Sequence, residues 1–341
     1  MLTPVTLLIS FVGLLVLELL YFKIAAAFNI VDRPSQRGSS DRITLRGGGV
    51  IFVLGAYIAF ALSGFLFPLF FLGLSLVAVI SFVDDIHSLS PRLRLVLQTI
   101  GVLLMLAQVA MPLVTSGTWN LATFSGQQWV IVSLYGLIGL IVVTGAIDIF
   151  NFMDGINGIT GGYALTVLIA LAVACHQLAA TGALPHSEAL QQLIVLTGLA
   201  DVVFCFFNFR RRARCFAGDV GSISIAFILL FVLCSLCVAT ENLSWFAFMV
   251  VYGVDGCLTI LHRVMLHEDI TTPHRKHAYQ LMANELHIPH VVVSLIYIVL
   301  QGAVDVVYFC FPGYLTLLLV IIALSLAYVA FMKKYYHLHN N

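Results

Sequence analysis

Two adjacent carboxylates, Asp84 and Asp85, stand at the end of a long apolar run, where few ionisable residues occur. Neighbouring carboxylates beside apolar surface repel each other and lose hydration, so they persist where a divalent cation or a cationic partner offsets their charge. Mg²⁺, which is held by a few carboxylates and by substrate phosphates, fits such a pair. The structural alternative is that the two side chains cap the following helix or pair with Arg92 and Arg94.

A second group of polar residues has a regular spacing. Asn151, Asp154 and Asn157 recur every three residues, so on a helical turn they would share one face. Gly155 and Gly158 would leave room for a ligand beside that face. A turn between two helices could also use Asn and Gly, but it would not need this spacing. We therefore interpret the segment as a ligand-facing stripe.

Two further segments place acidic and basic groups next to glycines. Asp219 lies between Gly218 and Gly221 and follows four arginines. We therefore expect Asp219 to have a functional role beyond that of an ordinary helix cap. Arg46 precedes three consecutive glycines, whose backbone N–H groups could cradle a phosphate. The alternative for the glycines is that they only ease helix packing.

Six of the eleven histidines fall in one loop near the C-terminal end of the chain, among basic residues. His274, Lys276 and His277 form its densest part, and their N–H groups could all donate to a phosphoanion. A zinc site is the alternative, because Glu268 and Asp269 could complete a ligand set.

The elements that must position these residues are transmembrane helices. The chain is 61% hydrophobic and 9% charged, with a mean hydropathy of +1.05, which excludes an ordinary soluble domain of 341 residues. A span needs roughly 20 apolar residues. We expect an all-α polytopic bundle of about 11 spans, forming a single membrane domain over 1–341. The apolar runs are 4–22, 47–64, 66–83, 93–112, 129–147, 160–180, 190–207, 220–239, 244–261, 289–310 and 312–332.

The positive charges predict the orientation of these spans. All 16 Lys and Arg residues fall in alternate connections: after the first, third, seventh, ninth and eleventh runs. By the positive-inside rule these connections and the C-terminus lie in the cytoplasm, and the N-terminus lies outside. The polar clusters then share the cytoplasmic face. No basic and aromatic motif points to a nucleic acid partner.

In this order the clusters resemble the polyprenyl-phosphate N-acetylhexosamine-1-phosphate transferase family. The resemblance runs over nearly the whole chain, and its motifs are Asp84-Asp85, Asn151-x-x-Asp154-Gly155-x-x-Gly158, Phe216-x-Gly218-Asp219-x-Gly221-Ser222 and the histidine loop. It implies an all-helical enzyme of ten or eleven spans in the inner (plasma) membrane. Such an enzyme transfers a sugar-1-phosphate from a UDP-sugar to undecaprenyl phosphate, releases UMP and uses Mg²⁺, with Mn²⁺ as a substitute. A homodimer is a further expectation.

The resemblance also implies roles for single residues. Asp84, Asp85 and Asp219 correspond to the catalytic carboxylates, and Asp219 and Asp85 to metal ligands. Substrate binding would fall to Asn151, Asp154, Asn157, Arg46, His274, Lys276 and His277. Among these, Asn157 matches a position associated with uracil, and His274 and His277 resemble phosphate-binding histidines.

Two departures from the family pattern leave the donor sugar open. The histidine loop reads His274-Arg275-Lys276-His277 where the family commonly has His-x-His-His, and arginines follow Asn208 where the family often has Pro-Ala. UDP-GlcNAc is the default donor, and a UDP-N-acetyl-6-deoxyhexosamine or UDP-GalNAc is the alternative. The product would initiate a cell-envelope glycan, in cell wall, O-antigen or lipopolysaccharide biosynthesis.

Rival functions have weaker support in the sequence. An ion-coupled transporter could use Asp201, Asp255 and Asp305 as an ion path, but no internal repeat is visible and the polar residues gather at one face. A CDP-lipid phosphatidyl transferase would need a different sequence after Asp154-Gly155.

Overall fold

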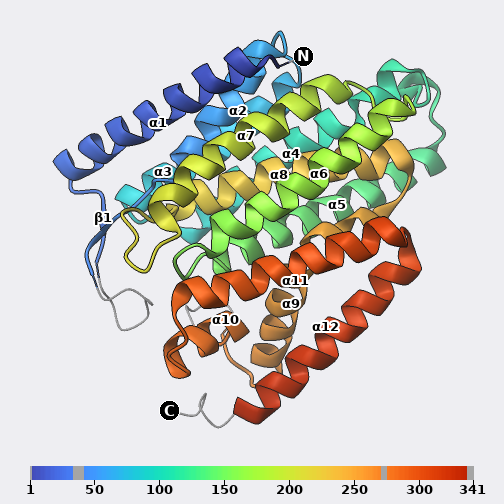
Figure 1. The fold of residues 1–341 in the computed structure, drawn as a ribbon. Coiled ribbons are helices and arrows are strands. Elements are labelled where there is room, and N and C mark those ends of the chain that lie inside the picture. Colours follow the sequence, from blue (N-terminus) through green and yellow to red (C-terminus); the bar gives the residue numbers. More distant parts are fainter. Residues whose placement is uncertain (1, 34–41, 270–274, 336–341) are drawn as a thin grey trace.

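The computed structural model describes residues 2–33, 42–269 and 275–335, and it is a bundle of long helices (Figure 1). Within those residues, ten helices are long and apolar enough to cross a bilayer. They are α1 (Pro4–Ala27), α3 (Pro68–Ile86), α4 (Pro91–Thr115), α5 (Gly126–Phe152), α6 (Ile159–Ala180), α7 (Ser187–Asn208), α8 (Gly218–Thr240), the combined segment Leu243–Met265, α11 (His290–Cys310) and α12 (Tyr314–Tyr335). The predicted polytopic helical fold is confirmed.

The run at 47–64 differs from the other predicted spans. It forms α2 (Val50–Leu62), whose 13 residues extend about 20 Å, short of the roughly 30 Å hydrocarbon core. Ten long helices and one short apolar helix therefore replace the eleven expected spans. The predicted break near Gly64 is confirmed, because α3 begins at Pro68 as a separate helix.

Shorter elements connect the helices. The span Leu243–Met265 begins as the 3₁₀ helix η2 (Leu243–Met249) and continues as α9 (Val250–Met265). The histidine loop contains α10 (Ala278–Gln280) and the π-helix η3 (Leu281–Glu285), and η1 (Leu121–Thr123) joins α4 to α5. The strands β1 (Val31–Asp32) and β2 (Thr44–Leu45) form one antiparallel pair.

Helix α8 lies at the centre of the bundle, and its middle is buried on every side (Figure 1). A helix that is apolar all round belongs in such a position. Phe231 of α8 stacks on Phe70 of α3 with 4.0 Å between ring centroids. Peripheral helices instead expose large apolar side chains, such as Leu315 and Leu326 of α12 and Tyr135 of α5. Those faces suit contact with lipid.

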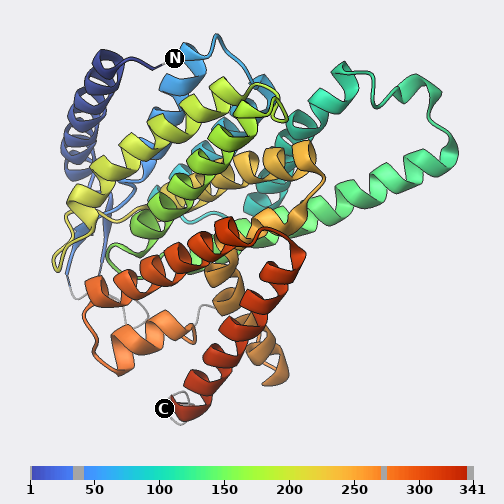
Figure 2. The same ribbon diagram turned by 45° about the vertical axis from the view of Figure 1, so that its right-hand side comes forward.

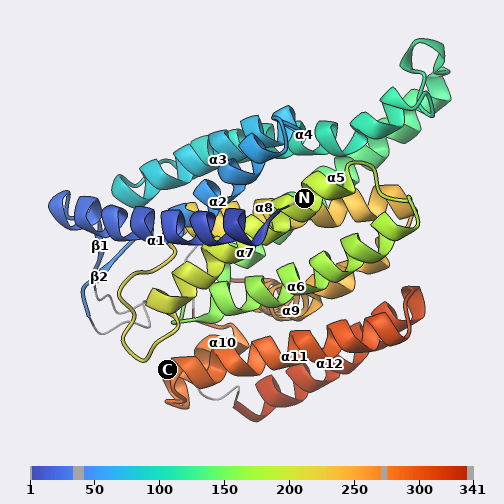
Figure 3. The ribbon, with the colours of Figure 1, turned by 45° about the horizontal axis from the view of Figure 1, so that its top comes forward.

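The views from other sides show two features of the arrangement. The tip of the α4–α5 hairpin extends away from the other helices (Figure 2). The pair α11 and α12 forms a layer on the opposite side of the molecule from α3 and α4 (Figure 3). Between them, the start of α8 meets the start of α2 and the end of α3, and this junction carries the acidic residues.

Close packing at that junction depends on glycine. An added Cβ on Gly221 of α8 would lie 2.7 Å from the Cα of Gly49, which directly precedes α2. Gly218 has φ +71°, and a Cβ there would lie 2.5 Å from the Asp85 carboxylate. Side chains at these positions would separate the helices that bring the acidic residues together.

Candidate active site

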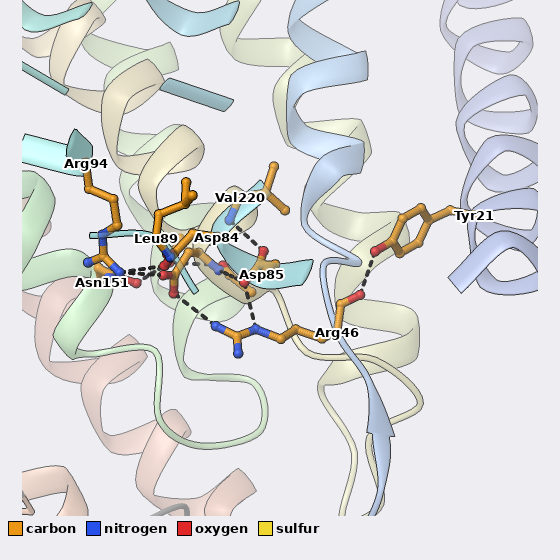
Figure 4. Close-up of polar contacts among 11 residues, drawn as sticks. Tyr21, Arg46, Asp84, Asp85, Leu89, Arg94, Asn151 and Val220 are labelled. Atoms are coloured by element: carbon orange, nitrogen blue, oxygen red, sulfur yellow. Dashed lines mark hydrogen bonds and ion pairs between the residues drawn. The ribbon is translucent and has the colours of Figure 1, made fainter. Parts of the chain in front are cut away.

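Asp85, in the last turn of α3, binds the start of α8 (Figure 4). Its Oδ1 accepts hydrogen bonds from the Asp219 backbone N–H at 2.9 Å and from Arg46 Nε at 2.7 Å, and its Oδ2 accepts the Val220 N–H at 3.0 Å. The side chain has no exposed surface. Asp85 therefore satisfies two of the N–H groups that a helix N-terminus leaves without partners, and its charge suits that end of the helix dipole.

Asp84 and Asp219 share a second arginine. Arg94 Nη1 lies 2.5 Å from Asp84 Oδ2 and 3.5 Å from Asp219 Oδ2, while Arg46 Nη2 lies 3.4 Å from Asp219 Oδ1. Asp84 also accepts the Leu89 N–H at 2.7 Å. Three carboxylates and two guanidinium groups thus leave one formal negative charge. The alternative for the aspartate pair was a helix cap or a pairing with arginine, and contacts of both kinds are present. Asp219, from a distant part of the chain, contacts the same two arginines.

Arg46 is held by its backbone on both sides. Its carbonyl accepts a hydrogen bond from the Tyr21 hydroxyl at 2.6 Å, and its own N–H donates to the Ile30 carbonyl at 3.1 Å. Burial alone would lower the pKa of Arg46, but Asp85 and Asp219 raise it above its ordinary value. The guanidinium therefore stays charged beside the carboxylates.

The glycines after Arg46 have a packing role. The N–H of Gly48 donates to Phe216 O at 2.9 Å, and that of Gly49 donates to Ala217 O at 3.1 Å. These two donors are used inside the protein, which favours the packing alternative for Gly48 and Gly49, while the predicted phosphate contact at Gly47 stays a prediction.

The polar stripe begins in the last turn of α5 and continues into the connection to α6, so the prediction that its three residues share one helix face is wrong. The three side chains make separate contacts. Asn151 Oδ1 accepts the Ser222 hydroxyl of α8 at 2.7 Å, which places Asn151 beside the acidic cluster (Figure 4). Asp154 accepts the Thr160 hydroxyl, and burial raises the pKa of Asp154 to about 6. Asn157 is buried, and its amide donates to the Arg210 carbonyl at 2.9 Å. Its assigned contact with uracil stays a prediction.

The histidine loop forms a separate group of contacts. His274 lies outside the described residues. Lys276 donates to the Glu268 carboxylate, which lowers the pKa of Glu268, and His277 Nδ1 lies 3.2 Å from Asp255 Oδ1. Within the described parts of the chain, no group of three or more His, Cys, Asp or Glu side chains surrounds one metal position.

Arg94 is the site residue that reasoning from the sequence did not select, although it was considered as a structural partner of the carboxylates. It lines a small pocket beside the acidic cluster, together with Asp84, Asp219 and Gln98. Gln98 Nε2 in turn donates to Asp148 of α5 at 2.9 Å. In the sequence, only the short distance of ten residues from Asp84 indicates that Arg94 could belong to the site. Arg92 is as close, so the sequence does not distinguish the two arginines.

Comparison with known families identifies the family of the chain. The model of glycosyl transferase family 4 matches residues 67–237, which is half of the chain and includes all three carboxylates. The chain belongs to glycosyl transferase family 4. The predicted family resemblance is confirmed.

Several proteins similar to this chain carry names that describe one reaction. A Bacillus subtilis protein, a probable undecaprenyl-phosphate N-acetylglucosaminyl 1-phosphate transferase, is 25% identical over 82% of this chain and 77% of its own length. Undecaprenyl-phosphate alpha-N-acetylglucosaminyl 1-phosphate transferases of Yersinia pestis and Escherichia coli are each 26% identical over 62% of this chain. The match spans 56% of the length of each of these two relatives.

Proposed function

We propose that this protein transfers N-acetylhexosamine-1-phosphate from a UDP-sugar to undecaprenyl phosphate, forming a lipid-linked sugar pyrophosphate and releasing UMP. The names of the family relatives support the reaction class and the acceptor. The observation that carries the proposal is the junction of Asp84, Asp85 and Asp219 with two arginines at the ends of spanning helices. A membrane-embedded acceptor must meet a water-soluble donor at such a place.

The acidic cluster fits Mg²⁺ as the cofactor, with Mn²⁺ as a substitute. Mg²⁺ is commonly bound by one or two carboxylates together with substrate phosphates, so a complete cage of protein ligands is not required. Asp219 and Asp84 have side chains 18% and 8% exposed, and both border the pocket beside α4. Asp85, predicted as a ligand with Asp219, uses its oxygens on α8 and Arg46, so we assign it to orienting Asp219. When bound, Mg²⁺ would neutralise charge on the donor diphosphate.

The chemistry requires charge neutralisation and alignment more than a strong base. An oxygen of the lipid phosphate attacks the sugar-linked phosphorus of the donor. The bond from that phosphorus to the bridging oxygen breaks, and UMP leaves with the bonding electrons. Arg46 and Arg94 are placed to bind phosphate oxygens once they exchange a carboxylate partner for substrate. A two-step route through an aspartyl phosphate is the alternative.

N-acetylglucosamine is the sugar that the relatives' names favour, so UDP-GlcNAc is the first donor to test. A UDP-N-acetyl-6-deoxyhexosamine or UDP-GalNAc remains the second candidate, because the arginines after Asn208 replace the family's usual residues there. We place the active site on the cytoplasmic face of the inner membrane, where every Lys and Arg connection is predicted to lie.

The test is UMP release by the purified protein in detergent, with undecaprenyl phosphate, Mg²⁺ and a panel of UDP-N-acetylhexosamines. We expect lipid-dependent UMP from one donor, lost with a chelator and reduced at least about 100-fold in Asp219→Asn. Asp305→Asn is the matched control, because Asp305 is a buried carboxylate whose Oδ1 accepts a hydrogen bond from Gln301 instead of an arginine.

Two other outcomes would contradict the proposal. If the Asp219→Asn variant retains lipid-dependent UMP release, the acidic cluster does not take part in the reaction. If the folded wild-type protein neither releases UMP from any donor nor binds UMP, it does not use a UDP-sugar as substrate.

A further inference from the structure

A buried network centred on Asp255 of α9 joins the histidine loop to its surroundings. Asp255 is 3% exposed, and its Oδ1 accepts hydrogen bonds from the Thr259 hydroxyl at 3.1 Å and the Ala278 N–H at 3.2 Å. Its Oδ2 accepts the Tyr297 hydroxyl of α11. The fourth partner is His277, whose Nδ1 lies 3.2 Å from Oδ1 and whose side chain is 1% exposed. One carboxylate thus connects α9, α11 and the loop.

The network determines the proton position on the His277 ring. A carboxylate that already receives three donors acts as an acceptor, so the ring nitrogen facing it must carry a proton. Nδ1 of His277 is therefore the donor to Asp255. Contacts of this kind set which tautomer a histidine adopts and how its ring is oriented.

The His277 segment also contacts the candidate substrate-binding stripe. The ring of His277 lies 6.5 Å from that of Phe152, the residue after Asn151, measured between centroids. Two residues further along the loop, the Tyr279 hydroxyl donates to the Phe152 carbonyl at 2.8 Å. The loop is thus fixed on one side by Asp255 and on the other by the segment that carries Asn151 and Asp154.

We propose that Asp255 is a positioning residue for the transferase reaction, which fixes the tautomer and ring orientation with which His277 meets the substrate phosphates. The inference rests on the proposed function and on the phosphate-binding role that the family resemblance implies for His277. Thr259 strengthens the arrangement, since its hydroxyl also lies 2.7 Å from that of Tyr328 in α12. The helices of the C-terminal third therefore support a loop whose described residues form only the short helices α10 and η3.

A double-mutant cycle tests whether Asp255 acts through His277. We expect Asp255→Asn to lower kcat/KM about 10- to 100-fold, as loss of an orienting partner commonly does. In the His277→Gln background the same change should have almost no further effect, because the group that Asp255 orients is gone. Asp305→Asn, which removes another buried carboxylate, should leave kcat/KM within about threefold. If the loss in kcat/KM of the double variant equals the product of the losses in the two single variants, the proposal is overturned.

A spectroscopic readout is independent of activity. In protein with ¹⁵N-labelled histidine, the His277 signal is identified by its loss in His277→Gln, and its shifts report which nitrogen is protonated. We expect a protonated Nδ1 in the wild type and loss of that preference in Asp255→Asn. A wild-type ring protonated only at Nε2 would overturn the proposal even if the variant fails to fold. An inactive wild type with the expected tautomer would instead count against the proposed function alone.

Discussion

At the scale of single residues, the adjacent aspartates have different tasks although the sequence presents them as a pair. Asp85 accepts two backbone N–H groups of α8 and the side chain of Arg46, and it is fully buried. Asp84 accepts one N–H from its own connection and faces Arg94, whose side chain is 39% exposed. Asp85 therefore contributes to the fold, whereas Asp84 is better placed for ligands.

This division predicts different effects for the two Asp→Asn variants. Asp85→Asn puts an amide donor against an α8 N–H or Arg46, so we expect a loss of about 1 to 3 kcal/mol in stability. Asp84→Asn should cost less stability, because its arginine partner is partly solvated, and should weaken the apparent affinity for Mg²⁺ in the UMP assay. Thermal unfolding in detergent without substrate measures the first effect. Equal melting temperatures for the two variants would contradict the assignment.

Asp154 gives a prediction about pH. Burial raises the pKa of Asp154 to about 6, above its ordinary value of 3.8, so between these values the folded protein binds a proton that the unfolded chain has released. Its contribution to stability is therefore largest below about pH 4 and is lost as the pH rises through 6. Asp154→Asn cannot ionise, so the variant should gain stability relative to the wild type from pH 4.5 to pH 7. A constant difference in melting temperature over that range would contradict this.

At the scale of elements, the N-terminus of α8 organises the site. Asp219 is the second residue of this helix, and Asp85 binds the N–H groups of its first turn. The start of α2 approaches so closely that Gly49 and Gly221 leave no space for a side chain between them. The positions of Arg46 and Asp219 thus depend on contact between two helix ends.

Gly221→Ala tests that contact. The new Cβ would lie 2.7 Å from Gly49 Cα and 2.9 Å from Ala217 Cβ, so α2 and α8 must separate. We expect a loss of about 1 to 3 kcal/mol in stability and a lower rate of UMP release. Gly136→Ala in α5 is the control, because no atom lies within 4 Å of its added Cβ, and there Ala should be neutral or stabilising by up to about 1 kcal/mol. Similar melting temperatures for both variants would show that the contact can relax.

At the scale of the whole molecule, the ion pairs place separate connections at one end of the bundle. Arg46 follows α1 and Arg94 lies at the start of α4, yet both contact Asp219. The positive-inside rule predicts that this end is cytoplasmic.

Reporter fusions measure that orientation. Alkaline phosphatase, which is active only outside the cytoplasm, should be active when fused after Gly182 and inactive when fused after Arg212. A fluorescent protein at the C-terminus that folds only in the cytoplasm should fluoresce. The opposite pattern would invert the topology and place the acidic cluster outside, where UDP-sugars made in the cytoplasm would not reach it.

The sequence by itself determined the membrane class, the positions of the long helices and the order of the polar clusters, because length and hydropathy are local properties. It did not show that the run ending at Leu62 forms a helix of only 13 residues, which ends before the turn that leads to Pro68. Sequence also selected Asp84, Asp85 and Asp219, but the family resemblance implied one shared role for Asp85 and Asp219, as metal ligands.

Only the tertiary structure decided those roles, because they depend on contacts between residues far apart in the chain. Asp85 meets the N–H of a residue 134 positions later, and Asp255 meets His277 across 22 positions. Which arginine faces the cluster, and which glycine N–H groups are already bonded, follow from how helix ends pack against each other. Spacing along a chain predicts neighbours within one helix, but it contains no information on the distance between two helices.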